Sequence, residues 1–448
     1  MGWSHRLAWS AYQLAHLSFL LPAVPFYALR RGGRGFGHWG FGHWGFGQYG
    51  PTLKGRATLG LGPADGRSRL WIHAVSVGEA GVAATLARDL PPDLPLVVTT
   101  VTPTGQAHAE RLFSAKAFAD RDVEIAYLPF DLGPAVDRFL RRFQPRALIL
   151  TEGDYWPLML SKLRRLDIPV LVANGRVSER AFGRQRRLGK VNRLFYGPVV
   201  CFAVQTEQDR ARLIELGADG EAVHVAGNLK FDTPAPDPKP EVETRLQSLA
   251  AGRPMIVAGS TMDGEEDAVL QAFRHAGGGS RALLVLVPRH PERWDGVADL
   301  LASQGWTFRR RSGFAGPGTS NEEPVDVVLL DSLGELAALY RLAAAAFIGG
   351  TLVPTGGHNP LEAAVFGAPT VVGPSMFNFQ EIADRFDQDR AWERAADAAG
   401  LGAIWRAWLD DPAAAKAVGD RALELLQRHR GATRRTLDLL APFLDAAE

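Results

Sequence analysis

The chain has 448 residues, of which 46% are hydrophobic and 22% charged, a composition typical of folded proteins rather than disordered ones. One hydrophobic core rarely extends over this length, so two globular domains are expected. The formal net charge of +1 gives no electrostatic reason to expect a nucleic acid partner. The one cysteine, Cys201, excludes a disulfide framework, and its apolar surroundings VVCFAV place it in the core.

Residues 1–34 are predicted to attach the chain to a membrane. Residues 7–29 contain no Asp, Glu, Lys or Arg and are about long enough to enter or cross a bilayer. Two prolines in this stretch leave an interfacial helix as an equal alternative to a full span. Three arginines follow within residues 30–34, so the positive-inside rule places the rest of the chain in the cytoplasm and a cleaved signal peptide is disfavoured.

Residues 35–68 are predicted to be a linker rich in glycine and aromatic residues. The stretch GFGHWGFGHWGFGQYG repeats a five-residue unit whose glycines oppose a stable helix. Its aromatic rings either lie in the membrane interface or belong to a flexible connection. His38 and His43 have no carboxylate or thiol near them in the sequence, so no metal site is expected there.

Residues 69–231 alternate between short apolar runs and stretches with helical spacing. This alternation predicts a parallel sheet with helices on both of its faces. The apolar runs are RLWIHAV, LPLVVTTVT, RALILTE, IPVLVAN and VVCFAVQT.

Four prolines in residues 232–240 predict a stiff, extended linker, after which residues 241–448 repeat the same alternation. The sequence therefore predicts an α/β protein with two doubly wound, Rossmann-like domains facing a cleft. Ligands of such sheets bind beyond the carboxyl ends of the strands. The second set of apolar runs is PMIVAGS, RALLVLVPRH, DVVLLDS, AAFIGG and PTVVGP.

Three segments of the first half carry candidate catalytic groups at strand ends. Glu79 in HAVSVGEAG lies in the first turn of a predicted helix, where it either caps the helix or serves as a general base. Glu152 and Asp154 in LTEGDYWPL either orient a reacting group or belong to a solvated turn. Lys230 in GNLKFD precedes the linker, where its ammonium either meets solvent or reaches a phosphate.

The second half carries candidate phosphate-binding and ribose-binding groups. Arg289 in VPRHPER offers a planar guanidinium that matches phosphate oxygens. The glycine of LDSLGEL leaves backbone amides free to meet a base or a phosphate. Glycine-rich turns flank HNPLEAA, where Pro360 begins a helix whose N-terminus suits a phosphate and Glu362 suits two ribose hydroxyls.

Residues 176–193 hold seven Arg and Lys residues against one acid, Glu179. Such a run is most often the solvated face of a helix. Beside a membrane anchor, it is also suited to the phosphates of an acidic lipid.

Many of these segments resemble the 3-deoxy-D-manno-octulosonate (Kdo) transferases. They follow the order of that family over roughly residues 70–440, and the N-terminal anchor resembles that family's as well. The resemblance implies a GT-B fold with an N-terminal domain for the lipid acceptor and a C-terminal domain for the CMP-sugar. The matching segments are HAVSVGEA, TTVTPTG, YLPFDLGPAVDRFL, NGRVSERAFG, GNLKFD, AGSTMDGEE, VPRHPER, DSLGELAALY, GGHNPLEAA and GPSMFNFQEIADRF.

The resemblance also implies roles for individual residues. Glu79 corresponds to the catalytic base, and Glu152 and Lys230 correspond to residues that stabilise the transition state. The implied donor is CMP-Kdo, and the implied acceptor is a phosphorylated lipid A precursor, lipid IVA, at the cell inner membrane. The implied reaction inverts the anomeric centre and uses no cofactor. The CMP-binding positions that it implies are Pro288, Arg289, Leu333, Gly334, Glu335, Asn359, Pro360, Leu361 and Glu362.

Some positions depart from the family pattern and affect the expected acceptor more than the expected donor. The family usually has Glu-Thr-Glu-Leu-Trp-Pro-Asn where this chain shortens one acid to Asp154 and has Leu158 in place of the asparagine. Asp387 and Asp389 form the Asp-x-Asp pattern of metal-dependent sugar transferases, but their polar helical surroundings predict a surface position and no metal.

Two alternatives remain open from the sequence. One is a GT-B transferase that uses another nucleotide sugar, such as a UDP-sugar. The other is a non-catalytic, membrane-bound nucleotide-binding protein, which the joint presence of Glu79, Glu152, Lys230 and Arg289 argues against.

Overall fold

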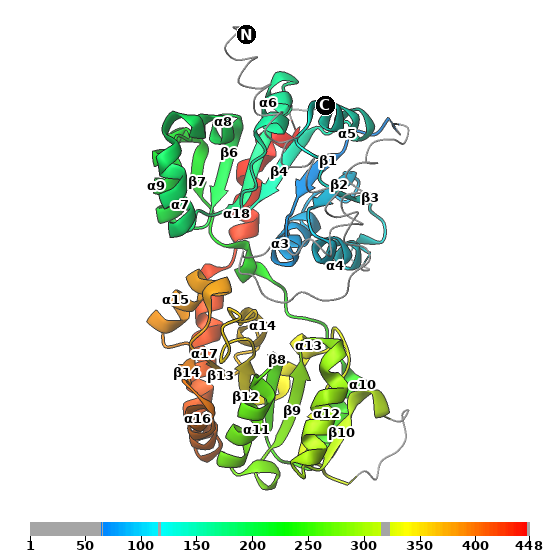
Figure 1. Cartoon of the computed structure of the whole chain (residues 1–448), viewed down its shortest axis with the longest axis vertical. Coiled ribbons are helices and arrows are strands. Elements are labelled where there is room, and N and C mark those ends of the chain that lie inside the picture. The colour runs from blue at the N-terminus through cyan, green and yellow to red at the C-terminus, as the bar shows by residue number, and fades with distance from the viewer. Residues whose placement is uncertain (1–63, 65, 115–117, 315–322, 446–448) are drawn as a thin grey trace, which may run out of the picture. The chain divides into compact units, whose positions relative to one another are not determined.

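The computed structural model describes residues 64, 66–114, 118–314 and 323–445 (Figure 1). These residues form two compact units: unit 1 runs to Asp232 and resumes at Gly431, and unit 2 runs from Thr233 to Arg430. The predicted anchor at 1–34 and nearly all of the predicted linker at 35–68 lie outside the described residues. Within the described ranges, no helix combines the length and the apolar character needed to cross a membrane.

Unit 1 is built on a seven-stranded sheet in the order β3-β2-β1-β4-β5-β6-β7, with every neighbouring pair parallel. Four of its strands are buried along their whole length because helices cover both faces of the sheet. The strands are β1 Leu70–His73, β2 Leu96–Thr100, β3 Val123–Tyr127, β4 Ala147–Thr151, β5 Val170–Gly175, β6 Val199–Val204 and β7 Val223–Val225. The helices before the linker are α3 Val77–Arg88, α4 Pro103–Phe113, α5 Gly133–Phe143, α6 Pro157–Arg165, α7 Glu179–Gln185, η4 Arg186–Asn192, α8 Arg193–Tyr196, α9 Glu207–Glu215, η5 Gly220–Ala222 and η6 Leu229–Asp232.

Alternate residues of β1 show how the two faces of this sheet are filled. Trp71 packs into the cluster that contains Phe139, with ring centroids 4.3 Å apart. Leu70 and Ile72 point into the other cluster, on the opposite face, together with Cys201. Cys201 is buried, as the apolar run around it predicts.

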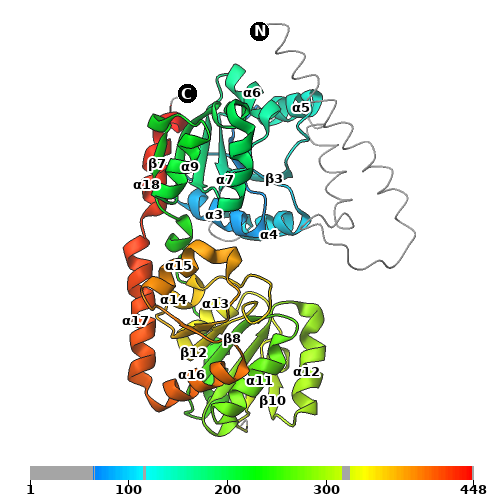
Figure 2. The same ribbon diagram turned by 60° about the vertical axis from the view of Figure 1, so that its left-hand side comes forward.

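The last helix, α18 (Ala432–Asp445, red in Figure 2), belongs to unit 1. The predicted boundary, which assigned 241–448 to the second domain, is therefore wrong for the final helix. Leu440 is fully buried in the cluster of Leu70 and Ile72, so the apolar face of α18 completes the core of unit 1.

Unit 2 has a second seven-stranded parallel sheet, in the order β10-β11-β9-β8-β12-β13-β14. Its core contains the fully buried Phe347 and Trp405, and the segment 233–239 that leads into it has neither helix nor strand, as its prolines predict. The strands are β8 Met255–Thr261, β9 Leu283–Pro288, β10 Phe308–Arg310, β11 Val327–Leu329, β12 Ala343–Ile348, β13 Thr370–Val372 and β14 Glu393–Arg394. The helices are α10 Pro240–Ala250, α11 Glu265–His275, η7 Gly278–Ser280, η8 Pro291–Arg293, α12 Trp294–Ser303, η9 Arg311–Gly313, α13 Leu336–Leu339, η10 Tyr340–Leu342, α14 Leu361–Ala364, η11 Phe377–Phe379, α15 Gln380–Gln388, α16 Ala398–Asp410 and α17 Pro412–His429.

Each sheet therefore has the doubly wound arrangement that the sequence predicts. In unit 1, β1 lies between β2 and β4, and in unit 2, β8 lies between β9 and β12. The chain changes direction across the sheet at these strands, and open parallel sheets bind ligands at such points, beyond the carboxyl ends of the strands.

Candidate functional site

In unit 1, the carboxylate of Glu79 lies just beyond β1, in the first turn of α3. Ser76 caps this helix and contacts Glu79: the Glu79 backbone N–H is 3.5 Å from Ser76 Oγ, and Ser76 Oγ donates to Glu79 Oε1 at 3.1 Å. The other carboxylate oxygen, Oε2, accepts from the Val75 backbone N–H at 2.9 Å and from Thr151 Oγ1 at 3.4 Å. The capping role is thus present, and it holds the carboxylate in one position at the edge of the sheet.

The surroundings of Glu79 also shift its acidity. Burial, reinforced by the negative charge of Glu152, raises the pKa of Glu79 from 4.5 to about 7. The hydrogen bonds from Val75 and Ser76 oppose this shift without cancelling it. A carboxyl group with a pKa near 7 is suited to accept a proton at neutral pH.

Glu152 and Lys230, which lie far apart in the sequence, form an ion pair at the same edge of the sheet. Lys230 Nζ lies 2.9 Å from Glu152 Oε1, and Arg176 Nε lies 2.6 Å from Glu152 Oε2. Burial alone would raise the pKa of Glu152, but the charges of Lys230 and Arg176 outweigh it and hold this pKa below its usual value. Lys230 and Arg176 therefore favour the ionised form of the Glu152 carboxyl group.

The backbone at this site adopts conformations that non-glycine residues rarely take. Glu152 has φ +59° and Asn174 has φ +58°, both in the left-handed region. The Asn174 side chain accepts from the Leu229 backbone N–H at 2.9 Å, and its amide lies 3.4 Å from Glu152 Oε1. These bonds join the ends of β4 and β5 to the turn that carries Lys230, which is the kind of support that strained functional residues require.

His73, which sequence reasoning did not single out, is the buried polar end of β1. Its Nε2 lies 3.1 Å from Asp154 Oδ2, and its Nδ1 lies 2.9 Å from Thr99 Oγ1. Asp154 Oδ2 also accepts from Trp156 Nε1 at 2.8 Å, so Asp154 is tied to two rings. The sequence feature that could have identified His73 is its place as a histidine at the end of an otherwise apolar strand.

In unit 2, Arg289 follows β9 and lies near the segment that begins α14. Burial raises the pKa of Glu362, against the opposing effects of the Arg289 charge and a hydrogen bond from Asn359. Burial, together with the charges of Arg289 and His290, lowers the pKa of His358 to about 4. Because its charge acts on both His358 and Glu362, Arg289 lies near these two side chains. Among the described residues, the Arg289 guanidinium forms no salt bridge with a carboxylate.

The other predicted positions of unit 2 surround strand ends as well. Pro288 is the last residue of β9, and Pro360 precedes Leu361 at the start of α14, where the Leu361 N–H donates to Asn359 Oδ1 at 3.2 Å. The predicted helix here is only the four residues Leu361–Ala364, so it supplies one helical turn rather than an extended N-terminus for a phosphate.

The predicted loop 333–335 follows β11. Leu333 is 57% exposed, and Gly334 has φ +81°, a conformation that explains a glycine at this position. Glu335 is held by two hydrogen bonds from Arg311, at 3.1 and 2.9 Å, and by one from Ser332. The loop therefore presents its leucine and its backbone outward, while its acid is already paired.

The first glycine-rich turn after β12 is occupied by a side chain of the protein itself. Glu265 is fully buried and accepts the backbone N–H groups of Gly350, Thr351 and Leu352 at 2.6, 2.9 and 2.9 Å. Its Oε2 also accepts the Met262 N–H at 2.9 Å. These amides are thus unavailable to a phosphate, which the sequence alone did not reveal.

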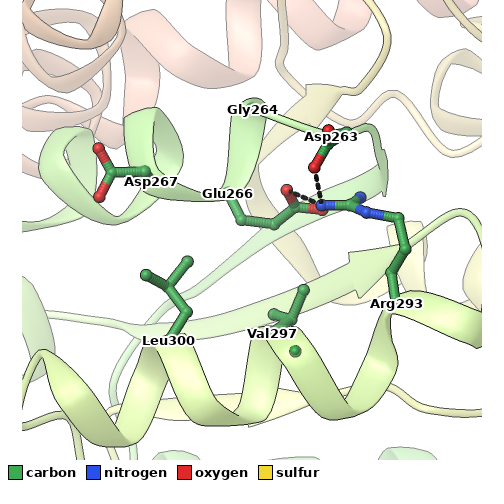
Figure 3. A pocket seen from close by; sticks show the side chains of 8 residues that line it. Asp263, Gly264, Glu266, Asp267, Arg293, Val297 and Leu300 are labelled. Atoms are coloured by element: carbon green, nitrogen blue, oxygen red, sulfur yellow. Dashed lines mark hydrogen bonds and ion pairs between the residues drawn. The ribbon is translucent and has the colours of Figure 1, made fainter.

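A hollow of about 390 Å³ lies between α11 and α12 (Figure 3). Arg293 crosses it to pair with Glu266 at 2.6 and 2.7 Å and with Asp263 at 3.3 Å. None of the predicted site residues lines it. The ion pair connects the turn after β8 to the turn after β9, and so it supports the segment that carries Arg289.

The Asp-x-Asp pattern of the sequence can be compared with the structure. Asp387 pairs with Arg394 at 2.8 Å and Asp389 pairs with Arg428, so the Asp-x-Asp carboxylates are engaged by cations. In the described part of the chain, no group of three or more His, Cys, Asp or Glu residues is arranged to hold a metal ion.

Comparison with known proteins gives the same family by sequence. The profile of the 3-deoxy-D-manno-octulosonic-acid transferase family matches residues 48–233. A 3-deoxy-D-manno-octulosonic acid transferase of Bordetella pertussis is 36% identical over 97% of this chain and 99% of its own length. A transferase of the same name from Haemophilus influenzae is 35% identical over 84% of this chain and 87% of its own length.

Comparison with solved structures concerns the fold alone. A UDP-GlcNAc 2-epimerase from Neisseria meningitidis, bound to UDP-GlcNAc, is 12% identical and covers 84% of this chain and 100% of its own, with a TM-score of 0.56. A protein of Anabaena in complex with UDP is also 12% identical and covers 85% of this chain and 100% of its own, with a TM-score of 0.54. Both support two Rossmann-like domains of the GT-B type.

Proposed function

Because this chain belongs to the Kdo transferase family, and is therefore a glycosyltransferase of lipopolysaccharide synthesis, we propose that it moves Kdo from CMP-Kdo to lipid IVA with inversion. The observation that carries the proposal is the state of Glu79. This carboxyl group has a pKa of about 7 and lies beside the fixed pair Glu152–Lys230 at the carboxyl edge of the sheet.

In the proposed reaction, Glu79 removes the proton from the acceptor hydroxyl as that oxygen attacks the anomeric carbon of Kdo. The bond from that carbon to the phosphate oxygen of CMP breaks, and CMP leaves with the electron pair. A single attack without a covalent intermediate inverts the anomeric centre. Glu152 holds the ammonium of Lys230 in place at 2.9 Å, so that Lys230 offers a fixed positive charge to the transition state.

The donor is proposed to bind unit 2 through its nucleotide. Arg289 is exposed and matches a phosphate, and the partly buried carboxyl group of Glu362, together with Asn359, suits the ribose hydroxyls. The exposed loop at 333–335 is proposed to contact the cytosine base. CMP that leaves with growing negative charge would be stabilised by the Arg289 guanidinium.

The catalytic units are proposed to lie on the cytoplasmic side of the cell inner membrane, where residues 7–29 attach the chain. The absence of charged residues in 7–29 and the arginines that follow support this placement. Deleting residues 7–29 should release a measurable fraction of the protein from sedimented membranes. The membranes are washed at high salt, which screens electrostatic attachment through other basic surfaces of the chain. Unchanged sedimentation of the deletion variant after this wash would refute an anchoring role for residues 7–29.

The decisive test is transfer by the Glu79→Gln variant. Incubation with CMP-Kdo and a tetraacylated lipid A precursor, followed by mass spectrometry, should show turnover reduced about 10²-fold or more, the usual scale for a general base. CMP affinity should change little, because Glu79 belongs to unit 1. The matched control is Glu207→Gln, which also changes an acid in the first turn of a unit 1 helix and should retain normal turnover. Near-normal turnover in Glu79→Gln would exclude the proposed base.

A further inference from the structure

Unit 1 carries an exposed surface that combines apolar and basic side chains, formed by residues 184–194. Leu188, Val191 and Leu194 are 46%, 51% and 40% exposed, and they are three of the nine large apolar side chains found exposed in the described chain. They occur within seven residues, so this is a concentration of apolar surface rather than the scattered exposure expected of any protein.

This segment is folded and anchored to the unit beneath it. Asn192 and Tyr196 are each 2% exposed, and both bond to Gln185: the Asn192 amide donates to the Gln185 carbonyl at 2.9 Å, and Tyr196 Oη donates to the Gln185 side chain. Tyr196 packs edge-on against Tyr155, with centroids 5.0 Å apart. The three apolar side chains are therefore presented outward by a fixed turn.

The basic side chains of the 184–194 surface are mostly free of acidic partners. Arg186 pairs with Glu215 at 2.8 Å, whereas the other four cations are exposed and form no ion pair with any described residue. Four cations without an acidic partner are therefore interspersed in the sequence with the three apolar side chains. These four are Arg184, Arg187, Lys190 and Arg193.

We propose that the 184–194 surface docks on the anionic face of a lipid bilayer, with its apolar side chains entering the headgroup region and its cations meeting the lipid phosphates. Apolar residues interspersed with Arg and Lys are the chemistry that binds anionic membrane surfaces. The N-terminal segment of the chain is a less suitable occupant, because it has basic residues and no acid before Asp65 and would be repelled.

The test places a polarity-sensitive fluorophore at single positions of the full chain. The chain's one cysteine, Cys201, is buried, so a Cys201→Ala background allows labelling of Val191→Cys alone. Vesicles containing phosphatidylglycerol should shift the emission of this label to shorter wavelength, and phosphatidylcholine vesicles should not. The control label is Val225→Cys, an exposed position of β7 outside residues 184–194, which should not respond to either vesicle.

Neutralising three cations tests the electrostatic part. The triple variant Arg187→Gln, Lys190→Gln, Arg193→Gln should lose the shift at position 191, since each basic residue near an anionic leaflet typically strengthens binding roughly five-fold. A label at 191 that stays as polar as the label at 225 would overturn the proposal. So would an equal shift on phosphatidylcholine, or a shifted emission without vesicles, which would indicate cover by the chain's own N-terminal segment.

This inference deepens the proposed function, because a bilayer surface is where a lipid acceptor would be met. The vesicles contain neither Kdo donor nor acceptor, so docking is measured independently of transfer. Absence of docking together with normal transfer would exclude the 184–194 surface as a membrane-binding site and leave the proposed reaction unaffected.

Discussion

The raised pKa of Glu79 predicts how the reaction depends on pH. The proposed base, Glu79, must be ionised to accept a proton, so the rate of transfer should rise as the pH increases through about 7, whereas an unperturbed glutamate would give this rise near 4.5. Initial rates between pH 5 and 9 at saturating substrates measure it. A profile that is flat between pH 6 and 8 would contradict the assignment.

The same shift has a consequence for stability. The unfolded carboxyl group ionises near 4.5 and the folded one near 7, so between these values the folded state binds more protons. The free energy of unfolding should therefore fall as the pH rises through this window. In Glu79→Gln, this contribution to the pH dependence of the free energy of unfolding should be absent. The difference between the two proteins therefore separates the titration of Glu79 from that of other groups.

The Glu152–Lys230 pair makes a prediction of its own. Lys230→Met should lower the free energy of unfolding by on the order of 3 kcal/mol, because it leaves the buried Glu152 carboxylate with Arg176 as its remaining cation. The double variant Lys230→Met, Glu152→Gln should recover part of this loss, as measured by urea unfolding. The control is the exposed ion pair Arg428–Asp389: Arg428→Met should lower the free energy of unfolding by at most about 1 kcal/mol. If Lys230→Met and the double variant lower the free energy of unfolding equally, the charges of Lys230 and Glu152 are not coupled.

Glu265 joins α11 to the glycine-rich turn after β12 through its hydrogen bonds to the backbone of residues 350–352. In Glu265→Gln, one oxygen becomes an NH₂ group that faces backbone N–H donors, so two of the four hydrogen bonds are lost. We expect faster hydrogen exchange at residues 350–352 and weaker CMP binding, since this turn leads into the Arg289–Glu362 cluster. Asp267→Asn, an exposed change on the same helix, should alter neither property. Unchanged hydrogen exchange at residues 350–352 would show that Glu265 does not hold this turn in place.

The elements themselves were largely predictable, because apolar runs of strand length alternate with helical spacing throughout both units. The contact between Ser76 and Glu79 was also predictable, since the two residues lie in one turn. The pairs that build the site were not: Glu152 meets Lys230, and Glu265 meets Gly350, only through the packing of distant strand ends. For the same reason the sequence places Arg176 in the basic run 176–193, whereas in the structure Arg176 forms an ion pair with Glu152.

The chain passes from unit 1 to unit 2 after Asp232 and returns at Gly431. Asp232 accepts the backbone N–H groups of Gly431 and Thr433, at 2.6 and 2.5 Å, so the two passages are bonded to each other. The second crossing was not predictable from sequence. α18 resembles any other amphipathic helix until its apolar face is found in the core of unit 1.

This division of the chain predicts where a nucleotide acts. A ligand that binds the folded state alone stabilises it by mass action, so CMP should raise the melting temperature and slow hydrogen exchange within residues 233–430, leaving the strands of unit 1 unaffected. UDP at the same concentration should raise the melting temperature less if the exposed loop at Leu333 contacts the base. Arg289→Gln should remove most of the CMP effect, because the phosphate then loses its guanidinium partner. Protection by CMP that appears in unit 1 instead, or an equal response to UDP, would assign the donor to a different site or a different nucleotide.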